Sequence, residues 1–129
     1  MQLTPVDLCN QAVTLFQEGK KEQANRLITM AIQADPGNHE IAFQYASIKE
    51  SLGSIPEAIS ICQQLYDHLD TYNYTELFRI ELCWLLGYSY AQLGDWKNAE
   101  RYLLESLHEP KKFKDSREDF PIEIRLSGG

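Results

Sequence analysis

The fold of this chain is decided by residues 82–99, which read LCWLLGYSYAQLGDWKNA. Apolar side chains recur along residues 82–93 at the spacing of one helix face. Gly94 then interrupts the pattern, because only glycine takes the left-handed conformation that ends a helix without steric cost. A second helical pattern follows, carried by Ala99, Leu103 and Leu107. The stretch therefore predicts two helices joined by a tight turn.

The same turn signature, a glycine followed five residues later by alanine, occurs three times in the chain. The copies are Gly19 with Ala24, Gly53 with Ala58, and Gly94 with Ala99. The first two glycines are 34 residues apart and the second two are 41 apart, which is the same step with seven residues inserted; the insertion falls in residues 70–75, at a repeat junction. Self-similarity at such a period indicates stacked supersecondary units.

Helix start and stop signals agree with this division. Thr4 and Pro5 are typical of the first positions of a helix, and Asp7 supplies an early carboxylate. Ser54 and Glu57 have the spacing of a capping box, so we expect their side chains to cap the fourth helix.

Three copies in phase resemble the tetratricopeptide repeat (TPR) family, whose 34-residue unit is a pair of antiparallel helices. The third copy carries the family signature most completely, at Leu86-Gly87, Tyr90, Gly94, Asp95-Trp96 and Ala99. The first copy matches at Leu8, Ala12, Leu15, Gly19, Ala24, Ile28, Ala31 and Pro36, and the second at Ala42, Tyr45-Ala46, Gly53, Ala58 and Cys62.

The resemblance implies an all-α fold, a TPR α-solenoid of three helix-turn-helix repeats with six antiparallel helices. We expect one domain over residues 1–110, with repeats at about 5–38, 39–72 and 80–110, followed by a C-terminal tail over 111–129 that serves as a cap or a linker. Small residues at the helix midpoints let paired helices approach closely. We expect Tyr45, Tyr90 and Trp96 to belong to the core.

In this family the first helix of each pair lines a concave groove, and the register assigns the groove residues. The partner-binding residues predicted in this way are Val6, Cys9, Val13, Phe16, Glu40, Phe43, Ser47, Glu81, Trp84 and Tyr88. Further groove positions are Asn10, Gln17, Gln44, Glu50, Ser51, Leu85, Ala91 and Gln92. Aromatic residues at helical spacing are also typical of a core, so Phe43, Trp84 and Tyr88 have two readings: groove anchors or core side chains.

The groove residues indicate the kind of partner. TPR modules that capture the carboxylate ends of heat-shock chaperones use Lys, Asn and Arg at five positions, which here hold Cys9, Val13, Gln44, Glu81 and Leu85. That subclass is therefore excluded. The acidic groove favours another protein that offers an apolar or basic peptide, or an amphipathic helix.

Composition excludes several other classes of function. The 129 residues include 12 Lys+Arg and 19 Asp+Glu, a net charge of −7, so we expect no binding to nucleic acid or to an anionic membrane. Three widely spaced cysteines and the absence of a leader pattern favour a reduced, cytoplasmic protein. We expect no catalytic residues, no metal site and no cofactor, because no phosphate loop, nucleophile motif or metal-ligand spacing occurs.

The last residues leave several readings open. Residues 111–117 carry four basic residues and one acid, so they can fold back on the acidic array with Phe113 and Phe120 as plugs. A homodimer formed through the uncapped C-terminal edge, or a longer chain, are the alternatives. The end at Gly128-Gly129 resembles the tail of ubiquitin-like proteins, which implies conjugation or processing through Gly129. A third functional alternative is an accessory TPR segment of a larger enzyme.

Overall fold

The computed structural model describes residues 3–107. The tail at 111–129, its proposed capping or linking role and conjugation through Gly129 lie outside the described residues. Between residues 3 and 107 the chain forms six α-helices and one short 3₁₀ helix. They are α1 (Pro5–Gln17), α2 (Lys21–Ala34), α3 (His39–Ser51), α4 (Ile55–Asp67), η1 (Leu69–Thr71), α5 (Glu76–Gln92) and α6 (Trp96–Leu107).

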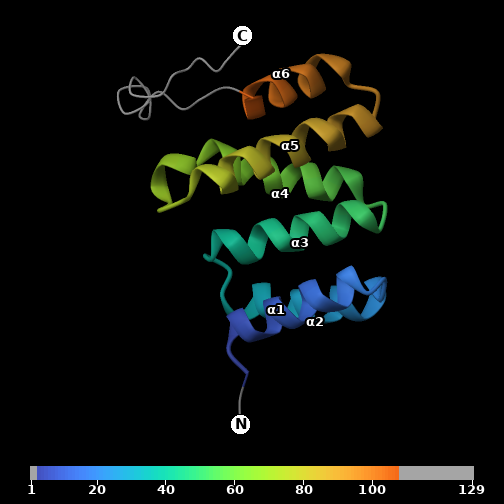
Figure 1. Ribbon diagram of the computed structural model, residues 1–129, viewed down its shortest axis with the longest axis vertical. Helices are drawn as coiled ribbons and strands as arrows, with labels where there is room; N and C mark the ends of the chain where they lie inside the picture. The colour runs from blue at the N-terminus through green and yellow to red at the C-terminus, as the bar shows by residue number, and fades with distance from the viewer. Residues whose placement is uncertain (1–2, 108–129) are drawn as a thin grey trace, which may run out of the picture.

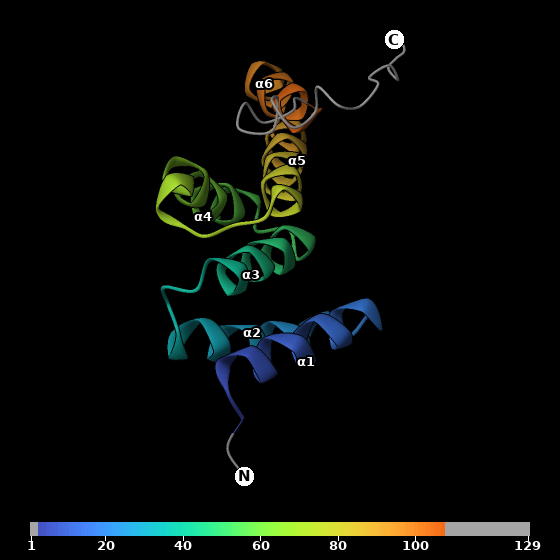
Figure 2. The ribbon, with the colours of Figure 1, turned by 60° about the vertical axis from the view of Figure 1, so that its left-hand side comes forward.

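The helices form consecutive hairpins that stack along the long axis of the molecule (Figure 1). Helices α1 and α2, α3 and α4, and α5 and α6 pack against each other, while α2 contacts α3 and α4 contacts α5. Figure 2 shows the same order from a second direction, with α1 and α2 at one end and α6 at the other. The expected all-α solenoid is confirmed.

The turns inside the hairpins depend on the three glycines. Gly19, Gly53 and Gly94 have φ values of 85°, 91° and 80°, which L side chains rarely adopt. Each follows the last residues of a helix, so the prediction that glycine closes the first helix of each pair is confirmed.

Two helix starts show how far capping signals can be read from sequence. The Thr4 side chain accepts from the Asp7 backbone N–H at 3.0 Å, and Asp7 accepts from the Thr4 N–H at 3.1 Å. The capping box predicted at Ser54 and Glu57 is wrong, because Ser54 makes no side-chain cap. Its backbone N–H, which Glu57 would need, instead donates to the Lys49 carbonyl at 2.9 Å.

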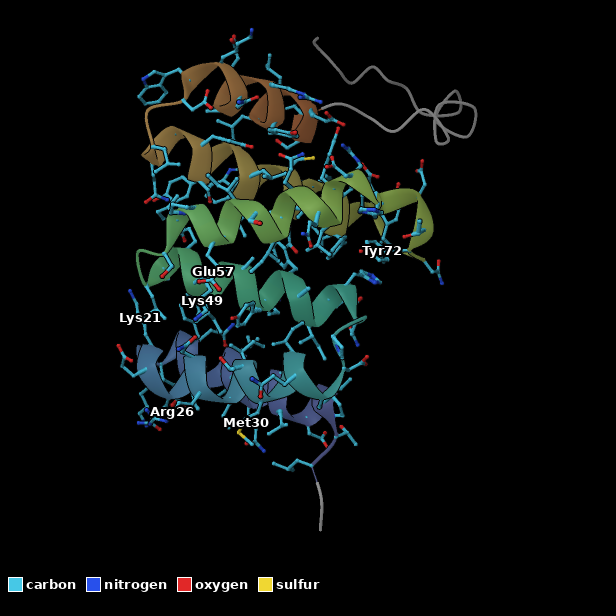
Figure 3. All side chains as sticks on the ribbon, turned by 180° about the vertical axis from the view of Figure 1, so that it is seen from behind. Lys21, Arg26, Met30, Lys49, Glu57 and Tyr72 are labelled. Atoms are coloured by element: carbon cyan, nitrogen blue, oxygen red, sulfur yellow. The ribbon has the colours of Figure 1, made fainter. Side chains whose placement is uncertain are left out.

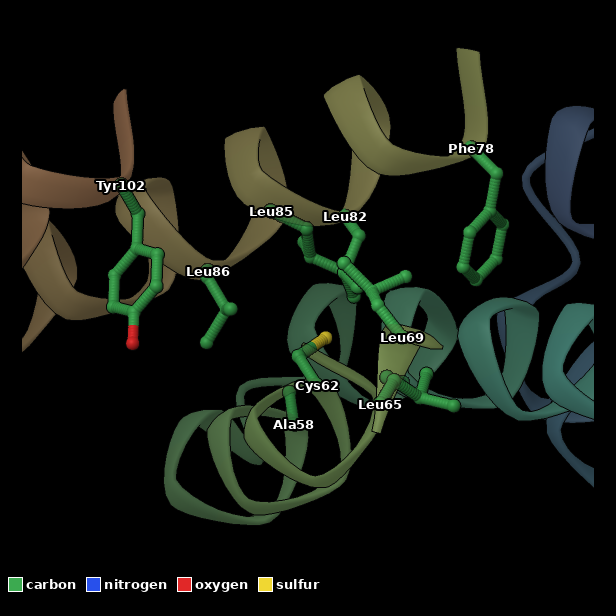
Figure 4. Close-up of a cluster of buried hydrophobic side chains, with 10 residues drawn as sticks. Ala58, Cys62, Leu65, Leu69, Phe78, Leu82, Leu85, Leu86 and Tyr102 are labelled. Carbon is green, nitrogen blue, oxygen red and sulfur yellow. The ribbon is translucent and has the colours of Figure 1, made fainter. Parts of the chain in front are cut away.

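The core consists of two clusters of buried side chains. One joins α1, α2 and α3 through Ala12, Ile28 and Ile41. The other joins α3 to α6, and Figure 4 shows its centre, where Cys62 and Leu65 of α4 face Leu82 of α5. The first two hairpins therefore each bury apolar surface against the hairpin that follows.

The inserted residues lengthen the third hairpin, so α5 begins at Glu76, four residues before the expected boundary. The added turn of α5 contacts both the preceding hairpin, through Phe78, and its own partner helix α6, through Arg79. Phe78 packs edge-on against Phe43 of α3, with ring centroids 5.6 Å apart. The Arg79 guanidinium pairs with Glu76 and donates to the Glu105 carbonyl near the end of α6 at 3.0 Å.

Three aromatic residues were expected in the core. For Trp96 this prediction is wrong, because the side chain is 69% exposed. Trp96 begins α6, and no described residue lies beyond that helix to cover it. Tyr45 and Tyr90 are half-buried. Tyr90 stacks on Tyr102, with ring centroids 5.9 Å apart.

The closest helix approach occurs at Gly87. A Cβ at this position would lie 2.6 Å from the Leu103 Cγ and 3.0 Å from the Ala99 carbonyl oxygen. Gly87→Val should therefore lower the free energy of unfolding by about 1–3 kcal/mol through overpacking. Chemical denaturation monitored by circular dichroism measures this loss. Gly37→Val is the control, since a Cβ on Gly37 meets no atom within 4 Å; equal losses for both variants would contradict the close approach.

Candidate functional site

The candidate site is a hollow, here called the cup, at the beginnings of α1, α3 and α5. It has a volume of about 470 Å³. Its lining residues are Val6, Cys9, Asn10, Val13, Thr14, Asn38, Glu40, Ile41, Phe43, Gln44, Thr75, Leu77, Phe78 and Glu81. Six of the ten predicted binding residues line the cup: Val6, Cys9, Val13, Glu40, Phe43 and Glu81.

The other four predicted residues lie outside the cup. Phe16 packs against the first core cluster, and Ser47 is half-buried on α3. Trp84 and Tyr88 are on α5, 53% and 44% exposed, with stacked rings whose centroids are 5.1 Å apart. The sequence left open whether this pair lines the groove or belongs to the core. Their exposure shows that the two side chains are not buried in the core of residues 3–107.

Trp84 and Tyr88 lie on the side of α5 that faces the groove. Tyr88 comes seven residues after Glu81, so the two side chains lie on the same face of the helix. Glu81 lines the cup, and on the same face Gln92 donates to Glu50 of α3 at 2.5 Å. Leu85 was expected to line the groove, and this is wrong: Leu85 is buried in the second core cluster.

Residues from the added turn of α5 also line the cup, and the repeat register did not include them. Thr75 caps α5 by accepting from the Phe78 backbone N–H at 3.1 Å, and Asn38 caps α3 in the same way. Leu77, 63% exposed, forms an apolar part of the rim. The available signal was Thr75 followed by Glu76, a helix start placed before the expected repeat boundary.

The cup is apolar in its walls and negative at its rim. Glu40 and Glu81 are exposed and form no ion pair with any residue between 3 and 107. No Lys or Arg is among the described lining residues. Figure 3, seen from behind, shows Lys21, Arg26 and Lys49, none of which lines the cup. A positively charged ligand would meet carboxylates without a competing cation.

The thiols do not provide a nucleophile. Burial raises the pKa of the Cys62 thiol to about 12 and that of the Cys83 thiol to about 11. Burial raises the pKa of Cys9 also, and the negative charge of Glu40 raises it further. All three thiols are therefore mostly protonated near neutral pH, which disfavours nucleophilic catalysis.

Two further properties of the described residues bear on function. Within residues 3–107, no cluster of three or more His, Cys, Asp or Glu side chains could hold a metal ion. The helices of that part of the chain also include none with the length and apolar content needed to cross a membrane.

The hairpins, their glycine turns and the groove along the first helices define a TPR-like all-helical repeat. Among solved structures, MamA MSR-1 C2, a TPR-type protein, is similar, with a TM-score of 0.63 and 19% sequence identity. The match covers 89% of this chain and 59% of that one, so this chain spans about three fifths of the length of the solved protein. At this identity the likeness concerns the fold. No family model matches the chain, and no curated protein matches it.

The position of Cys9 in the cup predicts how fast its thiol reacts with an alkylating reagent. The raised pKa lowers the thiolate fraction, so iodoacetamide should alkylate Cys9 more slowly at pH 8 than it alkylates free cysteine. For the same reason, the alkylation rate should continue to increase as the pH rises above 9. Glu40→Gln should speed the reaction, since it removes a negative charge that opposes the thiolate. Mass spectrometry of the modified peptide measures the rate.

Glu50→Gln is the matched control, because Glu50 is on the same helix but does not line the cup. Equal acceleration by the two substitutions would show that Glu40 does not act on Cys9 within a shared cup.

Proposed function

We propose that the protein is a non-catalytic protein-interaction module that binds an apolar or basic peptide, or one face of an amphipathic helix, in its groove. The observation that carries this proposal is the composition of the cup, in which apolar walls stand beside two carboxylates that pair with no cation of residues 3–107. Such a site is complementary to a Lys or Arg that lies next to an apolar side chain.

The cup can hold both parts of such a ligand. Val6, Val13 and Phe43 offer apolar contact, which suits a leucine-sized side chain or the methylene stem of a lysine. The charged end of that side chain would then reach Glu40 or Glu81, where a charge-assisted hydrogen bond is stronger than a neutral one.

The polar lining residues suit a peptide backbone. Asn10, Asn38 and Gln44 line the cup, and each has a side-chain amide whose NH2 group donates hydrogen bonds and whose carbonyl oxygen accepts them. The Asn38 side chain already accepts from two backbone N–H groups of α3, at 3.0 and 3.1 Å, so its orientation is fixed. Asn10 and Gln44 are therefore the better candidates for peptide contacts.

The stacked pair extends the surface along α5. Trp84 and Tyr88 present two aromatic faces next to Glu81 on the same helix, and exposed aromatic residues are common anchors at protein interfaces. A ligand that fills the cup can continue toward this pair. The acidic rim disfavours nucleic acid and anionic lipid for the same reason that it favours a basic peptide.

Selection from a random peptide library on the immobilised protein tests the proposal. We expect enriched sequences with Lys or Arg within a few residues of a large apolar side chain. Glu40→Gln combined with Glu81→Gln should weaken a selected peptide by roughly tenfold, corresponding to about 1.4 kcal/mol, because two charge-assisted contacts are lost. Isothermal titration calorimetry measures the affinity.

Glu22→Gln is the matched control, since Glu22 is an exposed acid of α2 that does not line the cup. It should leave the affinity unchanged. Enrichment of acidic peptides, or equal weakening by Glu22→Gln, would show that the cup does not recognise a basic ligand.

A further inference from the structure

The groove side of α5 carries one carboxylate and two aromatic rings in a line, here called the α5 row: Glu81, Trp84 and Tyr88. These residues stand at i, i+3 and i+7, a spacing that places them on one face of the helix. The rings of Trp84 and Tyr88 are stacked, with an angle of 11° between their planes. Glu81 is exposed and comes one turn before Trp84, so its carboxylate and the indole ring are neighbours on the helix surface.

Stacking uses one face of the indole ring and leaves the other face open. Among residues 3–107, Tyr88 is the aromatic residue whose ring contacts Trp84, and the Trp84 side chain remains about half exposed in spite of this contact. Tyr88 follows Trp84 by four residues, whereas Glu81 precedes it by three. The two neighbours therefore lie on opposite sides of the indole along the helix axis. A ligand on the open face of the indole would lie beside the Glu81 carboxylate.

The corresponding aromatic residue in the second hairpin is not open in this way. Phe43 stands ten residues before Gly53, as Trp84 stands ten residues before Gly94. Phe43 is half-buried, because Phe78 of the next hairpin packs against its ring, and it forms part of the wall of the cup. Within the described part of the chain, the third hairpin is thus the place where an acid stands next to an open aromatic face in the groove.

Negative charge is present at both ends of the α5 row. Glu81 begins the row, and at its other end Gln92 donates to the carboxylate of Glu50 across the groove on α3. Three basic residues of the neighbouring helices are held elsewhere. Lys49 and Arg101 lie over tyrosine rings, at 5.1 and 4.8 Å from the ring centroids, and Arg79 pairs with the glutamate three residues before it. The row therefore attracts a cation supplied by a partner.

We propose that the α5 row is an arginine-selective site, in which the guanidinium group of a bound peptide lies flat on the open face of Trp84 and donates to the carboxylate of Glu81. Glu81 also lines the cup, so the rest of such a peptide can continue from the row into the cup. This inference rests on the proposed function, because it names the basic residue that the groove selects.

Arginine fits this site because its charged group is planar. The five N–H donors of a guanidinium lie in its plane, so the group can stack on a ring and donate from its edge to a carboxylate at the same time. The long, exposed side chain of Glu81 can bring its carboxylate to that edge. The ammonium group of lysine is a compact, strongly hydrated charge without a flat face, and it gains less from the same two neighbours. Tryptophan is also the aromatic side chain that attracts cations most strongly.

Tyr88 acts in this site as a positioning residue. Its ring lies parallel to the indole, with centroids 5.1 Å apart, and so restricts the rotation of the Trp84 side chain before a ligand binds. A side chain that is already ordered loses less conformational entropy on binding. The ring of Tyr88 carries this role, so phenylalanine at this position should serve as well as tyrosine.

Nuclear magnetic resonance of the full chain with three small probes tests the proposal. The probes are the amides of Nα-acetylarginine, Nα-acetyllysine and Nα-acetylcitrulline; the first two carry one positive charge, and the third is planar but neutral. The chain has two tryptophans, so Trp96→Phe identifies the indole N–H signal of Trp84. We expect the arginine probe to shift this signal with an affinity roughly threefold higher than that of the lysine probe. The citrulline probe should give no saturable shift.

Variants of the row separate the roles of its members. Glu81→Gln should weaken the arginine probe by roughly threefold. Trp84→Leu should remove the preference for arginine over lysine, read from the backbone amide signal of residue 81. Tyr88→Leu should weaken the arginine probe, whereas Tyr88→Phe should restore binding. Glu22→Gln is the matched control and should change nothing. All these side chains are exposed, and far-UV circular dichroism checks that the variants remain folded.

Equal affinities of the arginine and lysine probes for the unchanged protein would overturn the arginine site, and so would a citrulline probe that binds as tightly as arginine. An arginine preference that survives Trp84→Leu would overturn it as well. These outcomes leave the proposed function standing, because a selected peptide can bind through the cup. In the reverse case, an arginine probe that shifts Trp84 while the peptide library enriches no basic sequence would contradict the proposed function and support the arginine site.

Discussion

The close approach of paired helices at small side chains is the constraint on which the rest of the structure depends. Ala12, Ala24, Ala46 and Ala58 are all fully buried, and Gly87 leaves no room for a Cβ beside Leu103. Because these positions are small, the larger neighbours can fill the spaces between the helices at normal packing density. The stacking of the hairpins, and therefore the groove along their first helices, follows from this approach.

The first two hairpins rely on the hairpin that follows for burial, so the two ends of the described array differ. Ile28 and Cys62 are buried because α3 and α5 follow them, while Leu103 and Trp96 have no such neighbour in residues 3–107. In a repeat architecture the interface between neighbours supplies much of the stability, and among residues 3–107 the last hairpin lacks the interface that the first two have. The exposed apolar side chains of α6 and the exposed aromatic pair of α5 are two results of the same constraint.

The register of the three glycines was sufficient to predict the six helices and most of the cup. Val6, Cys9 and Glu40 line the cup where the repeat positions put them. Leu77 and Phe78 were not predicted, because the inserted residues let α5 begin one turn early and direct that turn toward α3. The absence of the Ser54 cap has a similarly local cause, since the preceding turn already uses the Ser54 backbone N–H.

The sequence by itself determined the helix-turn-helix units, their glycine turns and the acidic character of the groove, because periodicity, left-handed glycine positions and charge are properties of local sequence. Only the tertiary structure decided that Leu85 is buried, that Trp96 is exposed, and that the added turn of α5 completes the cup. These outcomes depend on which neighbour covers a helix face, and an amphipathic pattern marks an apolar face without specifying its neighbour.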